Sequence, residues 1–184
     1  MRTQMDEYTW LTRYREILRR TDKYVIDEQP PGNVSEWLLH TDSLTQKLQQ
    51  ICNALTVEVT QQGWQAVGFE QHFANVLPNL TACSSCWLRE VVLKADGVPV
   101  IFAQTVLPEE TVNTVAQEVL NWGERPIGLW LFPQQPRRVT LEWQQDQASG
   151  LYARRSQLAL KGYPLEVREL FLPQFPFETT ERKA

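Results

Sequence analysis

Two parts of the chain have the pattern of β-hairpins closed by two-residue turns. The first hairpin is expected to join 87–94 to 98–107 around Asp96-Gly97, and the second 151–160 to 163–172 around Lys161-Gly162. Glycine in such a turn supplies the positive φ angle that a short hairpin connection requires. Because a two-residue turn sets the cross-strand register, it also sets which side chains share a face. The centre of the fold is therefore expected to be an antiparallel sheet.

Each predicted hairpin carries a charged side chain on its apolar face, since alternate residues of a strand point to the same side. In the first hairpin this residue is Arg89, and the turn register places it opposite Gln104. In the second it is Glu169, which the register places opposite Arg154. Burying an unpaired charge costs several kcal/mol, so these groups need either each other or a bound ligand.

Two interpretations of these inward charges stay open. In the first, Arg154 and Glu169 form an internal ion pair that only stabilises the fold. In the second they line a pocket with Arg89, because the arginine fork suits a carboxylate and a carboxylate on an apolar wall tends toward a raised pKa. A raised pKa is useful for moving protons. The second interpretation predicts a site for a small, partly apolar anion.

The rest of the chain predicts helices before the sheet and one helix within it. Helical spacing of apolar residues occurs at 8–18, 34–39, 43–52 and 109–122. Alternating or short apolar runs favour strands at 55–66, 127–132 and 139–143, whereas 69–85 supports no assignment. The predicted fold class is α+β: a single domain with a mainly antiparallel β-sheet flanked by helices.

Composition excludes several classes of function. A length of 184 residues suits one domain, and 18 basic against 22 acidic residues, a net charge of -4, argues against a nucleic acid binder. With 2 His and 3 Cys, no metal site is expected, and Cys83 and Cys86 lack the second pair that a zinc site needs. No stretch near the N-terminus is apolar enough for a signal peptide or a stable membrane insertion, which predicts a cytoplasmic protein.

Several sequence blocks resemble the chorismate pyruvate-lyase family and follow one another in register. They are EWLLHTDSLTQKLQQ, WLREVVLKADGVPV, QTVLP, ERPIGLWLF and GLYARRSQLALKGYPLEVRELFLP. The resemblance runs from Glu36 to about Pro176, apart from 65–86. It implies a single domain over 1–184, with 1–34 as an N-terminal helical extension, and an antiparallel sheet that encloses an internal ligand cavity.

The resemblance also implies an activity: elimination of pyruvate from chorismate to give 4-hydroxybenzoate for ubiquinone biosynthesis, without a cofactor. It places the substrate-binding and catalytic roles on Arg89 and Glu169, a backbone contact on Ile127 and an apolar contact on Leu44. These two charged positions are the same ones that the alternation of side chains along the strands, here called strand parity, places on an apolar face.

One position departs from the family pattern. Gln104 stands where the resemblance predicts an arginine; its amide can hydrogen-bond an anion but carries no charge. Gln104 and Arg154 are expected near the departing group, while Arg89 binds the ring carboxylate and Glu169 receives the ring hydroxyl.

Two rival functions belong to other classes. A non-catalytic binding module for a small aromatic acid, related to effector domains of transcription regulators, predicts a DNA-binding partner domain, and about 34 residues before the matched region are too few for a winged helix. A structural protein with an internal ion pair predicts no ligand at all. The lyase interpretation predicts a monomer whose partners are chorismate and 4-hydroxybenzoate, with no nucleic acid.

Overall fold

The computed structural model describes residues 4–20, 23–26, 28–66 and 85–178, with side chains from residue 9 onward. Its centre is a six-stranded sheet in the order β1-β2-β3-β6-β5-β4, and every neighbouring pair is antiparallel. The strands are β1 Leu55–Ala66, β2 Ser85–Ala95, β3 Val98–Pro108, β4 Arg137–Gln145, β5 Tyr152–Leu160 and β6 Tyr163–Phe171. The single-domain α+β prediction is confirmed.

Both predicted hairpins are present and both have the predicted turns. Asp96 and Gly97 have φ angles of 49° and 83°, and Lys161 and Gly162 have φ angles of 51° and 89°. Two consecutive positive φ angles are the signature of a type I′ turn. In the second hairpin the predicted register is confirmed, and Arg154 pairs with Glu169.

The first hairpin differs from its predicted register. Lys94 pairs with Pro99, but Leu93 pairs with Ile101, so β3 contains one additional residue at a bulge. Arg89 consequently pairs with Thr105 rather than with Gln104. The prediction that Arg89 faces Gln104 is wrong, because one extra residue moves every later side chain of β3 to the other face.

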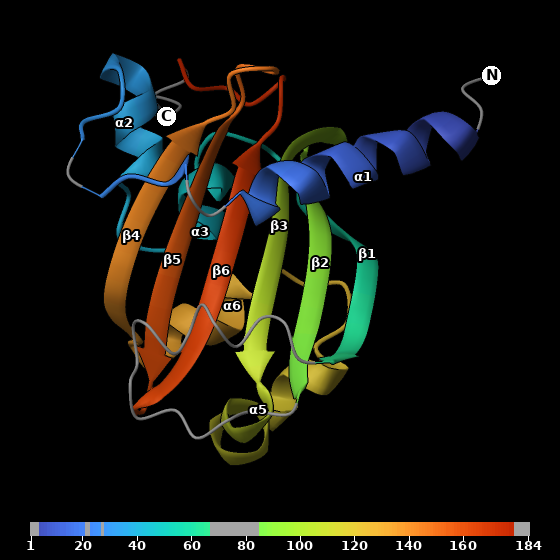
Figure 1. Cartoon of the computed structure of the whole chain (residues 1–184), viewed down its shortest axis with the longest axis vertical. Coiled ribbons are helices and arrows are strands. Elements are labelled where there is room, and N and C mark those ends of the chain that lie inside the picture. Colours follow the sequence, from blue (N-terminus) through green and yellow to red (C-terminus); the bar gives the residue numbers. More distant parts are fainter. Residues whose placement is uncertain (1–3, 21–22, 27, 67–84, 179–184) are drawn as a thin grey trace.

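Helices cover both faces of the sheet (Figure 1). Helix α1 crosses the near face, while α3 and α6 lie behind the sheet and α5 lies beyond one end of it. The helices are α1 Gln4–Arg19, α2 Gly32–Leu38, α3 Leu44–Gln49, α5 Glu109–Val115 and α6 Gly128–Leu131, with 3-10 turns η2 Gln117–Asn121 and η3 Phe132–Gln134. None of the described helices is both long and apolar enough to cross a membrane.

Two predicted elements are different in the structure. Residues 127–132, predicted as a strand, form α6 and the start of η3, in which Trp130 and Leu131 are buried. A short apolar run has no periodicity that separates a buried strand from a buried helix. The predicted helix 109–122 is divided at Ala116, whose φ of −137° is not helical, into α5 and η2.

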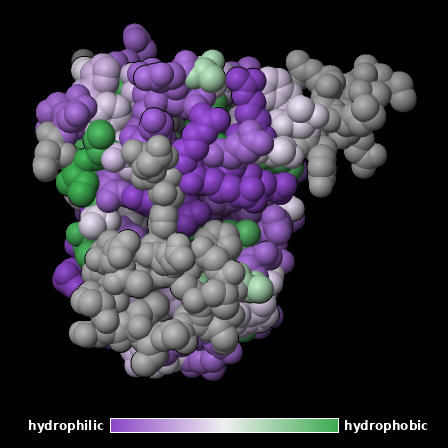
Figure 2. All heavy atoms as spheres, in the orientation of Figure 1, coloured by the Kyte–Doolittle hydropathy of each residue, from purple (hydrophilic) through white to green (hydrophobic). Residues whose placement is uncertain are grey.

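The sheet face that α1 crosses is partly polar, and its charged groups are buried. Helix α1 packs Ile17 and Leu18 onto an apolar part of this face that includes Phe102. On the same face, Glu90 of β2 and Arg168 of β6 lie on either side of Gln104 of β3, with which each of them is paired. Both are at most 4% exposed. Hydrophilic residues also dominate much of the described surface on this side (Figure 2).

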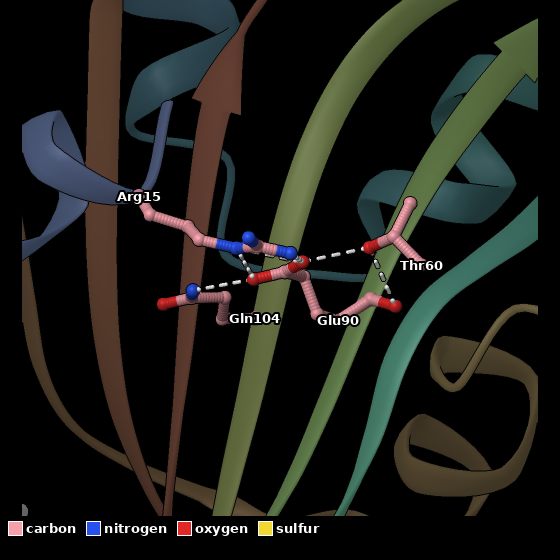
Figure 3. Close-up of polar contacts among 4 residues, drawn as sticks. All are labelled: Arg15, Thr60, Glu90 and Gln104. Atoms are coloured by element: carbon pink, nitrogen blue, oxygen red, sulfur yellow. Dashed lines mark hydrogen bonds and ion pairs between the residues drawn. The ribbon is translucent and has the colours of Figure 1, made fainter. Parts of the chain in front are cut away.

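Glu90 is the centre of one such network (Figure 3). Arg15 of α1 donates to both carboxylate oxygens, with Nε 2.9 Å from Oε2 and Nη2 2.6 Å from Oε1. Gln104 Nε2 donates to Oε2 over 2.9 Å, and Thr60 Oγ1 donates to Oε1 over 2.8 Å. Thr60 occupies a bulge between Val59 and Gln61 that interrupts the β1–β2 ladder. The network anchors α1 to β2.

We expect Glu90→Ala to lower the free energy of unfolding by about 3 kcal/mol at pH 7, because a buried charged pair loses one partner. Burial alone raises the pKa of Glu90, but hydrogen bonds from Arg15, Gln104 and Thr60 outweigh it and hold the pKa below its usual range. Because the pKa of Glu90 is lower in the folded state than in the unfolded state, its carboxylate stabilises the fold at pH values above the unfolded-state pKa, near 4.3. This stabilisation disappears as the pH falls through the folded-state pKa.

Urea unfolding of the wild type and the variant between pH 7 and pH 3 tests this prediction, and the difference between them should shrink below about pH 4. Glu58→Ala is the matched control, because Glu58 forms an ion pair with Lys94 but its side chain is 44% exposed. We expect that control to lose less than about 1 kcal/mol. Equal losses in the two variants would contradict a special role for the buried network.

Candidate active site

A cavity lies against the sheet face opposite to α1, between the sheet and helices α3 and α6. Two cross-strand rows of the sheet contribute to its lining: Arg89, Thr105, Val167 and Ser156 in one, and Val91, Ala103, Glu169 and Arg154 in the next. The helical side contributes Leu44 and Thr45 together with Pro126, Ile127, Gly128, Leu131 and Phe132. Apart from a few charged and hydroxyl groups, the lining is apolar.

Close packing of α6 on α3 brings the helical part of the lining together. A Cβ atom on Gly128 would lie 2.9 Å from Thr45 Oγ1 and 3.2 Å from Ser43 Oγ, so glycine permits this approach. Ser43 caps α3, its Oγ accepting from the backbone N–H of Gln46 over 3.3 Å. Leu44 and Ile127 therefore border the same cavity although they are far apart in sequence.

Arg89 is a buried cation whose hydrogen-bond partners among the described residues are neutral. It is 2% exposed; Nη2 donates to the carbonyl of Arg125 over 2.8 Å and Nη1 to Oε1 of Gln62 over 3.5 Å. Among the described residues, no carboxylate lies within ion-pair distance of it. Burial lowers the pKa of Arg89, but a guanidinium stays charged in a protein. Such a group is suited to hold an anion.

A short loop holds the carbonyl group that orients Arg89. The guanidinium of Arg125 stacks on the ring of Trp122 at 3.7 Å, and its Nε donates to the Trp122 carbonyl over 3.1 Å. Trp122 Nε1 in turn donates to the carbonyl of Pro126 over 3.2 Å. These contacts fix the backbone that leads into Ile127, so Arg89 and the helical wall are positioned by the same loop.

Glu169 is held in a clamp by Arg154. Nε of Arg154 donates to Oε2 of Glu169, and Nη2 lies 3.4 Å from Oε1. Nη1 of Arg154 donates to the carbonyls of Trp37 and His40, at 3.3 Å and 2.8 Å, near the C-terminal end of α2. Arg154 is 2% exposed, and each of its three nitrogen atoms donates to at least one of these groups. It therefore orients the Glu169 carboxylate in the cavity wall.

Arg138 of β4 also lines the cavity, and the sequence analysis missed it. Its Nη1 donates to Ser156 Oγ over 2.5 Å and its Nη2 to the carbonyl of Thr41 over 2.8 Å. With regular alternation along β4, Arg137 would share the cavity face of the sheet with Leu141. A bulge between Arg138 and Thr140 shifts the alternation, so that Arg138 faces the cavity instead. The sequence held no signal for this beyond the adjacent arginines, because nothing in it marks the bulge.

The cavity brings together most of the residues predicted for the site. Leu44, Arg89, Ile127, Arg154 and Glu169 all line it. Gln104 is the exception: it lies on the other sheet face and donates to Glu90, because the bulge in β3 reverses its direction. The predicted place of Gln104 beside the ligand is therefore corrected. Of the two cysteines for which no metal site was expected, Cys83 and Cys86, the first lies outside the described residues.

Comparison with known proteins identifies the family. The family model described as chorismate lyase matches residues 20–180. Chorismate pyruvate-lyase of Pectobacterium carotovorum is 36% identical over 150 residues, which cover 79% of this chain and 80% of that protein. The probable chorismate pyruvate-lyase of Bartonella quintana is 34% identical over 161 residues, covering 86% and 91%.

A solved structure agrees with the architecture. The effector domain of PhnF from Mycobacterium smegmatis superposes with a TM-score of 0.50 at 16% identity, over 79% of this chain and 92% of that one. At this identity the likeness concerns the fold alone. The family model and the relatives, by contrast, match in sequence over most of the length. The chain therefore belongs to the chorismate lyase family.

Proposed function

We propose that this chain eliminates pyruvate from chorismate in the cavity between the sheet and α3 and α6, leaving 4-hydroxybenzoate. Membership of the chorismate lyase family supports this reaction, in which a carbon–oxygen bond is cleaved by elimination. The observation that supports the location is a set of inward charges: Arg89, which has no carboxylate partner among the described residues, and Glu169, which Arg154 orients.

The charge of the cavity matches that of the substrate. Its described lining contains the guanidinium groups of Arg89, Arg138 and Arg154 and the carboxylate of Glu169. These four groups sum to two positive charges, whereas chorismate carries two carboxylates. The net charge of the whole chain is -4, so recognition of a dianion has to come from this local field.

The sheet suggests an orientation for the ring. Arg89 lies on β2 and Glu169 on β6, and the single intervening strand separates their backbones by roughly 10 Å. A ring whose carboxylate binds Arg89 can then direct its hydroxyl, on the opposite carbon, toward Glu169. Leu44 would contact the ring and the backbone at Ile127 would add a polar contact.

The reaction needs orientation and exclusion of water more than a strong acid or base. The bond between the ring and the enolpyruvyl oxygen breaks, and its electrons leave with enolpyruvate. The neighbouring hydroxyl-bearing carbon loses its hydrogen as a proton, and the electrons of that bond complete the aromatic ring. The proton is balanced when enolpyruvate becomes pyruvate. Arg89 orients the ring, and Glu169 accepts a hydrogen bond from the hydroxyl and assists the proton's departure.

One assay separates this function from its two rivals. Purified protein is mixed with chorismate, and pyruvate and 4-hydroxybenzoate are followed together. Equal amounts of both products support the lyase. Binding without products would support the non-catalytic binding module. The absence of both binding and products would support a purely structural protein.

The monomeric state, the cytoplasmic location and the absence of a nucleic acid partner are predictions from the sequence. A use of the product in ubiquinone biosynthesis is consistent with the activity.

A further inference from the structure

We propose that Arg138 binds the carboxylate of the departing enolpyruvyl group. This inference rests on the proposed function, and it concerns a residue that neither strand parity nor the family resemblance indicated. It assigns to Arg138 the role that the sequence analysis gave to Gln104 and Arg154.

Arg138 has an unused donor inside the protein. Its Nε is buried and has no hydrogen-bond partner in the described part of the chain, while both Nη atoms donate to neutral oxygens, those of Ser156 and Thr41. Among the described residues, no carboxylate lies within ion-pair distance of its guanidinium. A buried donor without an acceptor is unfavourable, and an oxygen of a bound ligand would satisfy it.

The surroundings of Arg138 concentrate positive charge at this end of the cavity. Burial, and then the charge of Arg154, lower the pKa of Arg138, whereas Glu169 and Asp42 raise it. Because Arg154 already clamps Glu169, Arg138 is the guanidinium at this end that can accept a further anion. Gln104 cannot contribute, since it lies on the other face of the sheet.

Strand order places Arg138 where the leaving group would extend. Glu169 on β6 lies between Arg89 on β2 and Arg138 on β4, whose strands are four spacings apart, roughly 19 Å at the backbone. In chorismate the enolpyruvyl ether is attached to the ring carbon next to the hydroxyl-bearing carbon. With the hydroxyl at Glu169 and the ring carboxylate at Arg89, the enolpyruvyl group can extend toward β5 and β4. Ser156 of β5 holds the Arg138 fork there.

This position has a consequence for substrate and product. Chorismate has the second carboxylate and 4-hydroxybenzoate does not, so Arg138 should distinguish the two, whereas Arg89 should bind both. A cation beside the departing enolpyruvate also stabilises the negative charge that grows as the ether bond breaks. Arg138 is therefore expected to favour the substrate over the product and to support the chemical step.

We expect Arg138→Gln to reduce kcat/KM for chorismate by roughly 100-fold, since a buried charge pair at an interface loses one partner. Its Kd for 4-hydroxybenzoate should change less than about threefold, because the product lacks the second carboxylate. Retained product binding also shows that the variant is folded. Arg138→Lys keeps the charge but loses the fork, so it should fall between the wild type and Arg138→Gln.

Arg137→Gln is the matched control, because Arg137 is exposed on the same strand, and both of its constants should equal those of the wild type. If kcat/KM for chorismate and Kd for 4-hydroxybenzoate change equally in Arg138→Gln, or if neither changes, the assignment is overturned. If the glutamine variant does not fold, the same two constants are measured in Arg138→Lys, and equal changes or no change there overturn the assignment. A wild type that binds chorismate without turnover contradicts the proposed function, yet the ratio of the two Kd values still tests Arg138. A wild type that binds neither ligand overturns both.

Discussion

Replacing Arg89 by alanine is expected to weaken 4-hydroxybenzoate binding by roughly 100-fold or more, which corresponds to the loss of one partner of a buried charge pair. Arg89 is 2% exposed and its other partners are the carbonyl of Arg125 and the amide oxygen of Gln62. Without the guanidinium, the ligand carboxylate would enter an apolar cavity unpaired. Isothermal titration calorimetry with 4-hydroxybenzoate measures this effect, and kcat/KM for chorismate should fall with it.

Two further variants sharpen this experiment. Arg89→Lys retains a cation but cannot form two parallel hydrogen bonds, so we expect an intermediate affinity. Lys94→Ala removes a cation from the same strand at a partly exposed ion pair with Glu58 and should leave the affinity unchanged. Unchanged affinity in Arg89→Ala would remove this residue from the site.

Glu169→Gln is expected to lower kcat by 10²- to 10⁴-fold, the usual contribution of a positioned acid–base group. The amide keeps the size of the side chain but cannot take up a proton. The affinity for 4-hydroxybenzoate should fall much less, because Arg89 still binds the ring carboxylate. Single-turnover measurements with saturating chorismate separate the chemical step from product release.

The same substitution also removes the carboxylate partner of Arg154, so stability has to be measured beside activity. Glu166→Gln is the matched control: Glu166 is buried on the same strand, faces the opposite side of the sheet and pairs with Arg168. It should lower the free energy of unfolding and leave kcat unchanged. Similar losses of kcat in the two variants would mean that Glu169 acts only through the stability of the fold.

Local rules predicted the second hairpin in detail. A turn at Lys161-Gly162 with two positive φ angles sets the register, and no bulge interrupts the β5–β6 ladder between the turn and the pair formed by Arg154 and Glu169. The pairing of Arg154 with Glu169 follows from counting residues outward from the turn. Where a ladder is continuous, alternation and turn length are sufficient to find an inward charge.

The bulges limited what counting could predict. One in β3 moved Gln104 to the far face, and one in β4 turned Arg138 into the cavity. A bulge depends on packing across neighbouring strands, and local sequence carries little trace of it. The strand predicted at 127–132 was wrong for a different reason: a short apolar run has no periodicity that separates a buried strand from a buried helix, and here it forms α6.

Apolar members of the site were found differently. Leu44 and Ile127 came from the family resemblance, because an apolar side chain that lines a cavity has the same sequence pattern as one in the core. Strand parity alone indicated Arg89, Arg154 and Glu169, because a charge among apolar neighbours is unusual. Both routes lead to one cavity in the structure.

A crystal structure with 4-hydroxybenzoate would show directly whether the proposed site is the binding site. We expect the ligand in the cavity between the sheet and α6, its carboxylate within hydrogen-bonding distance of the Arg89 guanidinium and its hydroxyl beside the Glu169 carboxylate. A ligand bound elsewhere, or one in the cavity with its carboxylate turned away from Arg89, would contradict this expectation.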